Sequence, residues 1–219
     1  MPEFDQGYWE SHWQRANRSG QLIAPNPYLA AEVGGLQPGT ALDAGCGEGA
    51  EAIWLAAHGW RVTAVDISSA ALTSAADRAD SGGAAERLEW VEADLSTWAP
   101  ASQFDLVTSH YAHPAMAQLA FYQRISLWVA AGGTLLIVGH LRFPVVAGHG
   151  EHGAHQHGSH DDGSRQPEEV TVTAASVLER LDRKQWDVVT ADERTRTLPG
   201  QEGGHGQLRD VVVRATRRV

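Results

Sequence analysis

The sequence lacks the features that mark disulfide-rich secreted domains, nucleic-acid binders and membrane proteins. Cys46 is the one cysteine among 219 residues, so no disulfide can form within the chain and an intracellular protein is expected. Lys and Arg number 17 against 27 Asp and Glu, and the net charge of −10 disfavours DNA and RNA as partners. No apolar run approaches the roughly 18 residues of a membrane span, and the first thirty residues contain no apolar block. These shortages predict a soluble, cytoplasmic protein that binds neither nucleic acid nor membrane.

The composition is that of an ordinary globular domain. Hydrophobic residues make up 42% and charged residues 20% of the chain, and a chain of this length can bury roughly 70% of its surface around one core. We therefore expect a single domain with four parts. These are an N-terminal segment at 1–39, a core at 40–141, a histidine-rich insertion at 142–170, and a helix with a terminal hairpin at 171–219.

Short apolar segments alternate with helical patterns through the first two thirds of the chain. Because β-branched and apolar residues in runs of this length indicate buried strands, five strands are predicted before the insertion. The fifth is apolar along nearly its whole length, which is typical of a parallel strand buried on both faces. The five segments are 40–47, 61–68, 88–95, 104–111 and 133–141.

Helices are expected in the intervals between these strands. An alanine-rich helix follows the second strand, and Ser68 or Ser69 is placed to cap its first turn. Another helix is expected from Pro114 to about Val129, since proline is tolerated in a first turn, and Gly132-Gly133 is expected to end it. The helix behind the first strand is predicted to have the apolar positions Ile53, Trp54, Ala56 and Ala57.

The last third of the chain contains a helix pattern and two alternating segments. A helix is predicted at 174–184, and the segments 186–197 and 207–219 are joined by a glycine-rich connection that favours a hairpin. Strands that alternate with helices indicate an α/β fold. We expect a doubly wound, seven-stranded, mostly parallel sheet of Rossmann-like type with a C-terminal antiparallel hairpin. Three arginines are expected to lie solvated at a sheet edge, namely Arg214, Arg217 and Arg218.

A glycine-rich turn between the first strand and the first helix is the strongest functional signal. Gly45, Gly47 and Gly49 allow the backbone to turn sharply and to approach a ligand that a side chain would keep away. Asp66 ends the second strand, 21 residues after Gly45, where a carboxylate can accept hydrogen bonds from both hydroxyls of a ribose. Because ligands of open α/β sheets bind beyond the carboxyl ends of the strands, a cofactor containing a nucleoside is predicted here.

Two classes of cofactor fit this arrangement. The spacing Gly45-x-Gly47-x-x-Ala50 also satisfies a loosened dinucleotide fingerprint, so a nicotinamide oxidoreductase stays open as an alternative. An acid two residues before the first glycine, Asp43, argues against it. The sequence also has no Tyr-x-x-x-Lys pair, since its one lysine, Lys184, lies far along the chain in a surface-like helix.

Further residues extend the glycine turn into a longer pattern. The turn reads D-x-G-x-G-x-G from Asp43 to Gly49, Asp66 closes the second strand, the residues Glu-Ala-Asp-Leu at 92–95 close the third, and Gly132-Gly133 precedes the fifth. In these features, over roughly residues 40–141, the sequence resembles the class I S-adenosylmethionine-dependent methyltransferases. The resemblance implies an enzyme whose core at 40–141 binds S-adenosylmethionine as cofactor.

Three segments point to a narrower group within that class. They are the leader YWESHW at 8–13, the segment Asn26-Pro27-Tyr28 and the stretch 47–68. In these segments the sequence is similar to the tellurite-resistance and thiopurine-type methyltransferases. The similarity implies a small molecule as the substrate.

The resemblance also implies roles for individual residues. Gly45 and its neighbouring backbone would hold the methionine part of the cofactor, with Asp43 beside the amino group. Asp66 would bind the ribose and Asp94 the exocyclic amine of adenine, while the backbone near Leu95 would meet the ring. The alternative for the acids at strand ends is that they only cap helices. The full set of expected cofactor-binding residues is Asp43, Gly45, Gly47, Gly49, Asp66, Ile67, Asp94, Leu95 and Trp13.

The chemistry of methyl transfer narrows the substrate. Because a sulfonium becomes a neutral thioether in an in-line displacement, the enzyme mainly aligns the nucleophile and excludes water. A thiol or another chalcogen nucleophile is accessible as an anion near neutral pH, whereas an alcohol or phenol depends more on a base. A sulfur, selenium or tellurium centre is therefore favoured over oxygen or nitrogen. The candidate catalytic residues are His110, Tyr111 and His113, and the alternative for His110 is a hydrogen-bonded wall that takes no proton.

The aromatic leader allows two interpretations. Tyr8, Trp9 and Trp13 could form a lid over the sulfonium, because aromatic faces attract cations. They could equally anchor an N-terminal helix to the core, since Trp and Tyr are buried on average.

The insertion after the fifth strand is rich in histidine and glycine. Imidazoles spaced by two or three residues could gather around zinc or nickel, which leaves open a rival in which the fold carries a metal-handling or metal-sensing tract. A flexible polar loop is the alternative, because glycines do not organise a metal site in advance. The candidate ligands are His149, His152, His155, His157 and His160.

Overall fold

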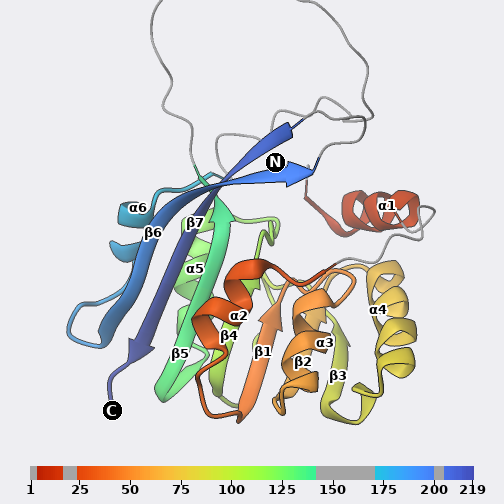
Figure 1. The fold of residues 1–219 in the computed structure, drawn as a ribbon, viewed down its shortest axis with the longest axis horizontal. Helices are drawn as coiled ribbons and strands as arrows, with labels where there is room; N and C mark the ends of the chain where they lie inside the picture. Colours follow the sequence, from red (N-terminus) through yellow and green to blue (C-terminus); the bar gives the residue numbers. More distant parts are fainter. Residues whose placement is uncertain (1–3, 17–23, 142–170, 200–204) are drawn as a thin grey trace, which may run out of the picture.

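The structure is a computed structural model that describes residues 4–16, 24–141, 171–199 and 205–219. Seven strands form one sheet in the order β3-β2-β1-β4-β5-β7-β6 (Figure 1). Neighbouring strands are parallel except at β7, which runs antiparallel to both β5 and β6. The predicted α/β class, the mostly parallel sheet and the antiparallel hairpin are confirmed. The strands are β1 (Thr40–Ala44), β2 (Arg61–Asp66), β3 (Leu88–Glu92), β4 (Phe104–His110), β5 (Val129–His140), β6 (Trp186–Pro199) and β7 (His205–Arg217).

The centre of the sheet is where the strand order reverses. The chain continues from β1 to β2 and β3 on one side, and β4 pairs with the other side of β1. All but one residue of β1 and all but one of β4 are buried, because helices cover both faces. The parallel strands end together at the upper edge in Figure 1. Ligands of such sheets bind beyond this carboxyl edge, next to the reversal.

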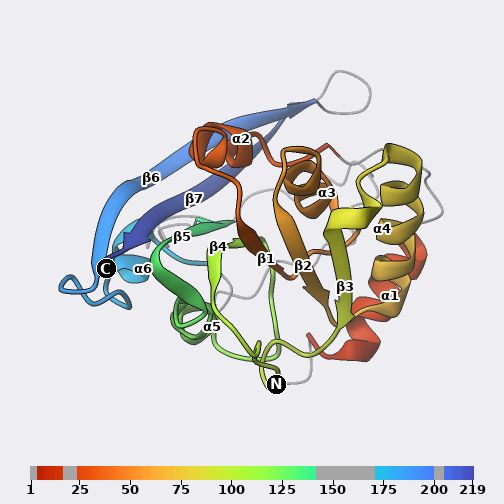
Figure 2. The same ribbon diagram turned by 90° about the horizontal axis from the view of Figure 1, so that it is seen from below.

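Helices cover both faces of the sheet, as Figure 2 shows from below. The helices α2, α3 and α4 lie on one face, and α5 and α6 lie on the other. Their apolar sides pack on the sheet and form two cores separated by it. Their bounds are α2 (Pro27–Val33), α3 (Ala50–Ala57), α4 (Ser69–Gly82), α5 (Gln118–Ser126) and α6 (Ala174–Leu178).

The N-terminal helix, α1 (Gln6–Ala16), takes a different position. It lies above the carboxyl edge beside the start of α4 rather than on a face of the sheet (Figure 1). Its sequence is polar as well as aromatic, as expected for a helix that covers a site. No helix within the described part of the chain is long and apolar enough to cross a membrane.

The helix predicted from Pro114 begins later and ends earlier. α5 starts only at Gln118. The side-chain Nε2 of Gln118 donates to the carbonyl of Ala112 (2.9 Å), and its Oε1 lies 3.0 Å from His113 Nδ1, so the preceding residues form a loop. The prediction that Gly132-Gly133 ends this helix is wrong. Both glycines lie inside β5, where its register against β4 shifts by an irregularity, and Gly132 has a φ of +77°.

Two other helix predictions need correction. α6 ends at Leu178 instead of 184, because a turn around Asp182, which accepts a bond from the Lys184 amide (2.9 Å), redirects the chain into β6. α3 buries Ala52, Leu55 and Ala56, whereas Ala57 is exposed. The predicted apolar face was therefore displaced by about one position. Ile53 and Trp54 are only half-buried.

The terminal arginines do not lie on an edge strand. β7 is inserted between β5 and β6, and the edge of the sheet is β6. Arg217 donates to the carbonyl of Val129 (2.6 Å), and Arg218, beyond the strand, pairs with Asp187 (2.6 Å). The expectation of an edge strand was wrong, because β7 rather than β6 pairs with β5. Arg218 is exposed, as expected.

Candidate active site

The glycine turn lies at the carboxyl edge, next to the strand reversal. Gly45, Gly47 and Gly49 have φ angles of +83°, +50° and +78°, a region that side chains rarely allow. The amides of Gly45 and Cys46 both donate to the carbonyl of Val65 (2.8 and 3.0 Å), which fastens the turn to β2. The backbone thus makes the sharp turn that its glycines predict, and these bonds hold the turn against β2.

Asp66 connects this turn to the start of α4. One carboxylate oxygen accepts from the amide of Gly47 (2.8 Å), and the other accepts from the amide of Ser68 (3.0 Å). Burial raises the pKa of Asp66, and these backbone bonds oppose the shift. Ser68 caps α4, as expected. Asp66 therefore shapes the turn, and each of its oxygens keeps lone pairs for a further donor.

Asp43 lies beneath the turn and is almost fully buried, with 1% of its surface exposed. One of its oxygens, Oδ2, has no hydrogen-bond partner. Burial raises the pKa of Asp43 well above its ordinary value, and the carboxylates of Glu51 and Asp66 raise it further. A buried carboxylate with an unused oxygen, close to two other acids, is a site that a cation would stabilise.

His110 ends β4 and lies deep in the same region. Its Nδ1 contacts the hydroxyl of Thr108 (3.2 Å), while its Nε2 is buried without a partner. Burial lowers the pKa of His110, although Glu51 acts in the opposite direction. The imidazole is therefore neutral near pH 7 and has one nitrogen available for a ligand.

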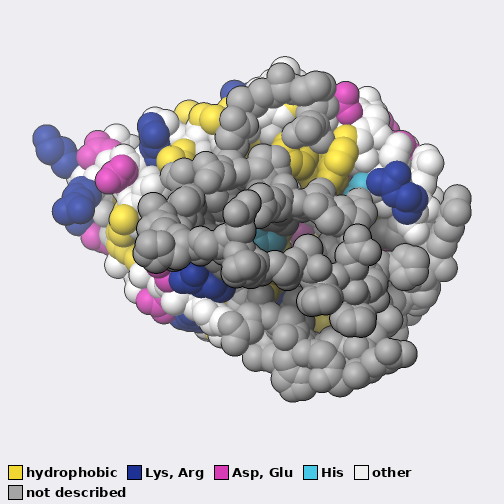
Figure 3. Space-filling model, turned by 90° about the horizontal axis from the view of Figure 1, so that it is seen from above, with side chains coloured by type: hydrophobic (Ala, Val, Ile, Leu, Met, Phe, Trp, Pro, Cys, Tyr) yellow, Lys and Arg dark blue, Asp and Glu magenta, His cyan; other side chains and the backbone are white. Residues whose placement is uncertain are grey.

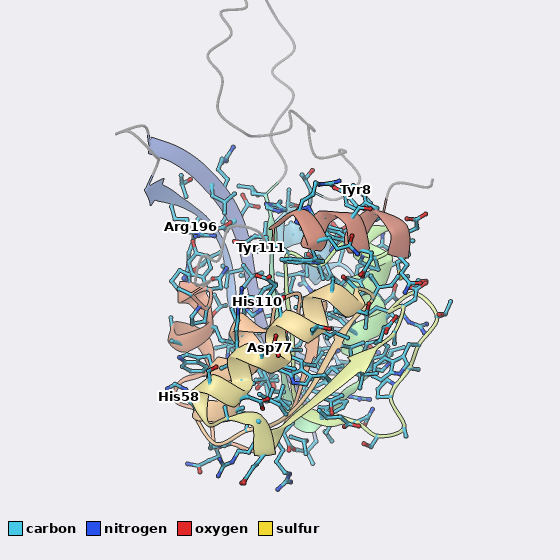
Figure 4. The ribbon with its side chains drawn as sticks, turned by 90° about the vertical axis from the view of Figure 1, so that its right-hand side faces the viewer. Tyr8, His58, Asp77, His110, Tyr111 and Arg196 are labelled. Carbon is cyan, nitrogen blue, oxygen red and sulfur yellow. The ribbon has the colours of Figure 1, made fainter. Side chains whose placement is uncertain are left out.

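Tyr111 departs from the strand geometry. Its φ of +55° is the one positive value at a residue other than glycine within the described ranges. Its hydroxyl donates to Asp210 on β7 (2.7 Å) and accepts from Arg196 on β6 (3.2 Å). In Figure 4 Tyr111 lies between Arg196 and His110. These bonds hold a conformation that costs free energy, and such conformations cluster at functional sites.

Two more imidazoles continue from Tyr111 toward α1. The ring of Tyr111 lies 4.6 Å from that of His140, and His140 lies 5.5 Å from His113. Phe4 follows at 5.9 Å from His113. Burial is the main cause that lowers the pKa of both histidines, to about 4 for His140. We call Tyr111, His140 and His113 the ring wall, and it is uncharged at neutral pH.

The helix α1 closes the carboxyl edge from above. A Cβ on Gly47 would lie 2.8 Å from the Trp13 ring, so this ring covers the glycine turn. Trp9 donates to the carbonyl of His113 (3.2 Å), and Glu10 accepts from the hydroxyl of Ser68 (2.7 Å). These contacts place Trp13 over the glycine turn and tie α1 to the core, so they fit both interpretations of the leader. Tyr8, at 38% exposure, lies at the outer side of the helix (Figure 4).

The residues expected near adenine are gathered at the adjoining strand end. Asp94 follows β3, which pairs with β2 so that Glu92 lies opposite Asp66. The carboxylate of Asp94 accepts a hydrogen bond from the Ser96 amide (2.8 Å). Leu95 is buried. Ile67, directly after Asp66, is half-buried. The structure thus brings all nine expected cofactor residues to one edge of the sheet.

The histidine-rich insertion falls outside the described residues. The expected metal ligands His149, His152, His155, His157 and His160 all lie there. Within the described ranges no group of three or more potential metal ligands occurs.

Figure 3 views the carboxyl edge from above, with histidine and hydrophobic side chains visible between the grey residues.

Sequence reasoning missed several residues of this region. His140 could have been found, because it is the next-to-last residue of the fifth predicted strand and lies at the same edge as His110. Glu51 accepts a bond from the Asn26 amide (2.8 Å), and this contact over 25 residues has no sequence signal. The contribution of Asp210 and Arg196 depends on how the terminal hairpin joins the sheet, which the pattern of residues does not specify.

Comparisons with known proteins agree with this geometry. Residues 41–133 match a family model described as a methyltransferase domain. A probable thiol methyltransferase 2 of Arabidopsis thaliana is 30% identical over 150 residues, covering 66% of this chain and 65% of that protein. Trans-aconitate 2-methyltransferase of Streptomyces avermitilis is 32% identical over 144 residues, covering 62% of this chain and 50% of that protein. The chain therefore spans less than two thirds of the length of either relative.

The fold is also shared with a solved structure. TehB from Haemophilus influenzae superposes with a TM-score of 0.66 at 15% identity. The superposition covers 96% of this chain and 67% of that one. At this identity the likeness concerns the fold, and it includes the terminal hairpin as well as the core.

Proposed function

Because residues 41–133 match a methyltransferase domain family and the glycine turn lies with Asp43 and Asp66 at the carboxyl edge, we propose that the chain is a class I S-adenosylmethionine-dependent methyltransferase that transfers a methyl group from that donor to a small molecule. We further propose that the acceptor atom is sulfur, selenium or tellurium in preference to oxygen or nitrogen. The observation that carries the proposal is the buried Asp43 with its unused oxygen beneath the glycine turn. A donor that carries an ammonium and a sulfonium would supply a cationic partner for this buried carboxylate.

The residues at the carboxyl edge fit such a donor. When bound, S-adenosylmethionine supplies a methyl group on a positively charged sulfur. Asp43 would accept a hydrogen bond from its ammonium, and Asp66 would accept from the ribose hydroxyls with the lone pairs that the Gly47 and Ser68 amides leave free. Trp13 and its helix would exclude water from above.

The acceptor would lie on the other side of the strand reversal, between His110 and the ring wall. His110 is neutral and has a buried, unpartnered Nε2, so it can take a proton from a bound thiol. A thiol has a pKa of about 8.5 and needs only modest help to ionise. The thiol methyltransferase among the relatives supports sulfur, whereas the trans-aconitate enzyme is a relative that acts on a carboxylate compound.

The proposal is tested by measuring methyl transfer directly. Purified protein is incubated with the donor and a panel of thiols, selenols, tellurite, phenols and heterocyclic amines, and products are detected by mass. Parallel titrations with S-adenosylhomocysteine and with NADH use tryptophan fluorescence. Binding of NADH alone would overturn the proposal in favour of an oxidoreductase. Methylation confined to oxygen or nitrogen acceptors would overturn the preference for a chalcogen.

His110→Gln is expected to reduce kcat on a thiol about 100-fold, the lower end of what general-base residues contribute. The affinity for S-adenosylhomocysteine should change less than about threefold, because His110 is placed on the acceptor side. His58→Gln is the control, since that exposed histidine stacks on Trp54 at the end of α3 and lies far below the site (Figure 4). An unchanged kcat across pH would remove His110 from the mechanism.

Ligand binding is expected to strengthen with pH because of Asp43. Its pKa is raised in the free protein, and an ammonium beside it would lower that pKa, so protons oppose binding until the pH exceeds the raised value. The increase in Tm caused by S-adenosylhomocysteine should therefore grow between pH 5 and 8, as measured by intrinsic fluorescence. In Asp43→Asn the same shift should be smaller and independent of pH, and an identical slope in both proteins would contradict the assignment.

A further inference from the structure

Asp210 and Arg196 form an ion pair at the acceptor end of the site. Asp210 is fully buried on β7, and its Oδ2 accepts from Arg196 Nε (2.9 Å). Its other oxygen accepts from the Tyr111 hydroxyl (2.7 Å). Arg196 also donates to that hydroxyl (3.2 Å), as does the side-chain amide of Asn26 (3.4 Å). Both lone pairs of the hydroxyl and its proton are therefore in use.

The ring wall carries no net charge at neutral pH, and the neighbouring ion pair adds none. Tyr111 is protonated at neutral pH because burial raises its pKa, and His113 and His140 are neutral because burial lowers theirs. Arg196 is the guanidinium that touches this wall, and Asp210 cancels its charge. The wall thus offers rings without net charge.

An uncharged wall discriminates between acceptors by their state of ionisation. A thiol is mostly protonated at pH 7 and can enter such a site neutral, whereas a carboxylic acid, with a pKa near 4, enters as an anion. Burying that anion without a free cation is unfavourable. A guanidinium released from its partner would remove this barrier, because it binds carboxylates with two parallel hydrogen bonds.

We propose that Asp210 is a specificity-determining residue, which excludes carboxylate acceptors by holding Arg196 in an ion pair and leaves the site selective for neutral thiols. The inference rests on the proposed function for the meaning of the site, and it specifies the substrate class. Both residues lie in the terminal hairpin, outside the stretch that matches the methyltransferase family model. The hairpin would therefore set the acceptor class, while the core holds the donor.

The test uses two probes of similar shape, phenylmethanethiol and benzoate. Benzoate binding is measured by calorimetry to the full chain, with and without S-adenosylhomocysteine, and methylation of both probes is measured by product mass. The expected result is no detectable benzoate binding to the unaltered protein and at least tenfold tighter binding to Asp210→Asn. Equal benzoate affinity of the two proteins would overturn the inference, and so would tight binding to the unaltered protein.

A double variant, Arg196→Met with Asp210→Asn, controls for damage to the fold. It removes both charges, so it should keep the thiol preference and fail to bind benzoate. Benzoate binding by the double variant, or a loss of its thiol methylation of more than tenfold, would also overturn the inference. Failure of the unaltered chain to bind S-adenosylhomocysteine would refute the proposed function separately, since benzoate affinities are also compared without that ligand.

Discussion

Replacement of Asp66 by alanine is expected to weaken the binding of S-adenosylhomocysteine at least about 100-fold. The change removes the acceptor proposed for the ribose hydroxyls, and it also frees the Gly47 and Ser68 amides that hold the turn in shape. Hydrogen bonds to a charged group contribute about 1.5–3 kcal/mol each, and 100-fold corresponds to about 2.7 kcal/mol. The measurement is a titration by calorimetry or tryptophan fluorescence.

Asp105 provides a matched control for this variant. It lies at the opposite end of the sheet, where its Oδ2 accepts from the amide and the hydroxyl of Thr40 (2.8 Å each). Asp105→Ala therefore also removes a carboxylate that is bonded to backbone at a strand end. It should lower the free energy of unfolding without changing ligand affinity. If both variants lost affinity equally, Asp66 would be a structural residue only, and the assignment of the ribose site would fail.

Gly45→Ala is expected to lower the free energy of unfolding by about 3 kcal/mol and to abolish donor binding. The residue has a φ of +83°, which costs an alanine about 1–2 kcal/mol. The new methyl group would also collide with the side chain of Ala112 in the loop behind β4, and overpacking adds about 1–3 kcal/mol. Unfolding in urea measures the loss of stability, and titration with S-adenosylhomocysteine measures the loss of binding.

Gly83→Ala separates the two contributions to this loss. Gly83 ends α4 with a φ of +70°, but a Cβ there would meet no atom within 4 Å. The substitution should therefore cost only the conformational part, about 1 kcal/mol, and leave binding intact. A similar loss of stability in both variants would show that the loop behind β4 yields to the methyl group.

The strands of this fold could be predicted because their signals are local. β1, β2 and β4 are short apolar runs that stop at polar residues or glycine, and the structure places them within a few residues of their predicted bounds. Their parallel pairing follows from the alternation with helices. The order of the last two strands could not be predicted. The sequence pattern of β7 is the same whether it pairs with both β5 and β6 or with β6 alone.

The helix ends were predicted less well because side-chain contacts between distant residues set them. Pro114 is compatible with a first turn, yet Gln118 uses its amide on Ala112 and His113 and so delays α5. Gly132 was expected to end a helix, but the same preference for positive φ serves an irregularity in β5. A glycine signals a conformation and does not say which element contains it.

The candidate site divides in the same way. The proposed donor side, from Asp43 to Asp66, is encoded in one continuous βαβ unit, so the alternation of strands and helices predicted that its residues share one sheet edge. The acceptor side combines Tyr111 with Asp210, 99 positions later in the chain. Such a pair is specified by tertiary packing, and a single sequence contains no signal for it.

The internal position of β7 has a consequence for how the protein is made. Residues 205–217 leave the ribosome after every other described strand, yet they fill the place between β5 and β6. Until then β5 pairs with β4 on one side only, and its other side is an open edge along a long apolar run. Such an edge is prone to aggregate with other chains. We expect the nascent chain to depend on chaperones at this stage, and the proposed acceptor side of the site to form only after translation of β7.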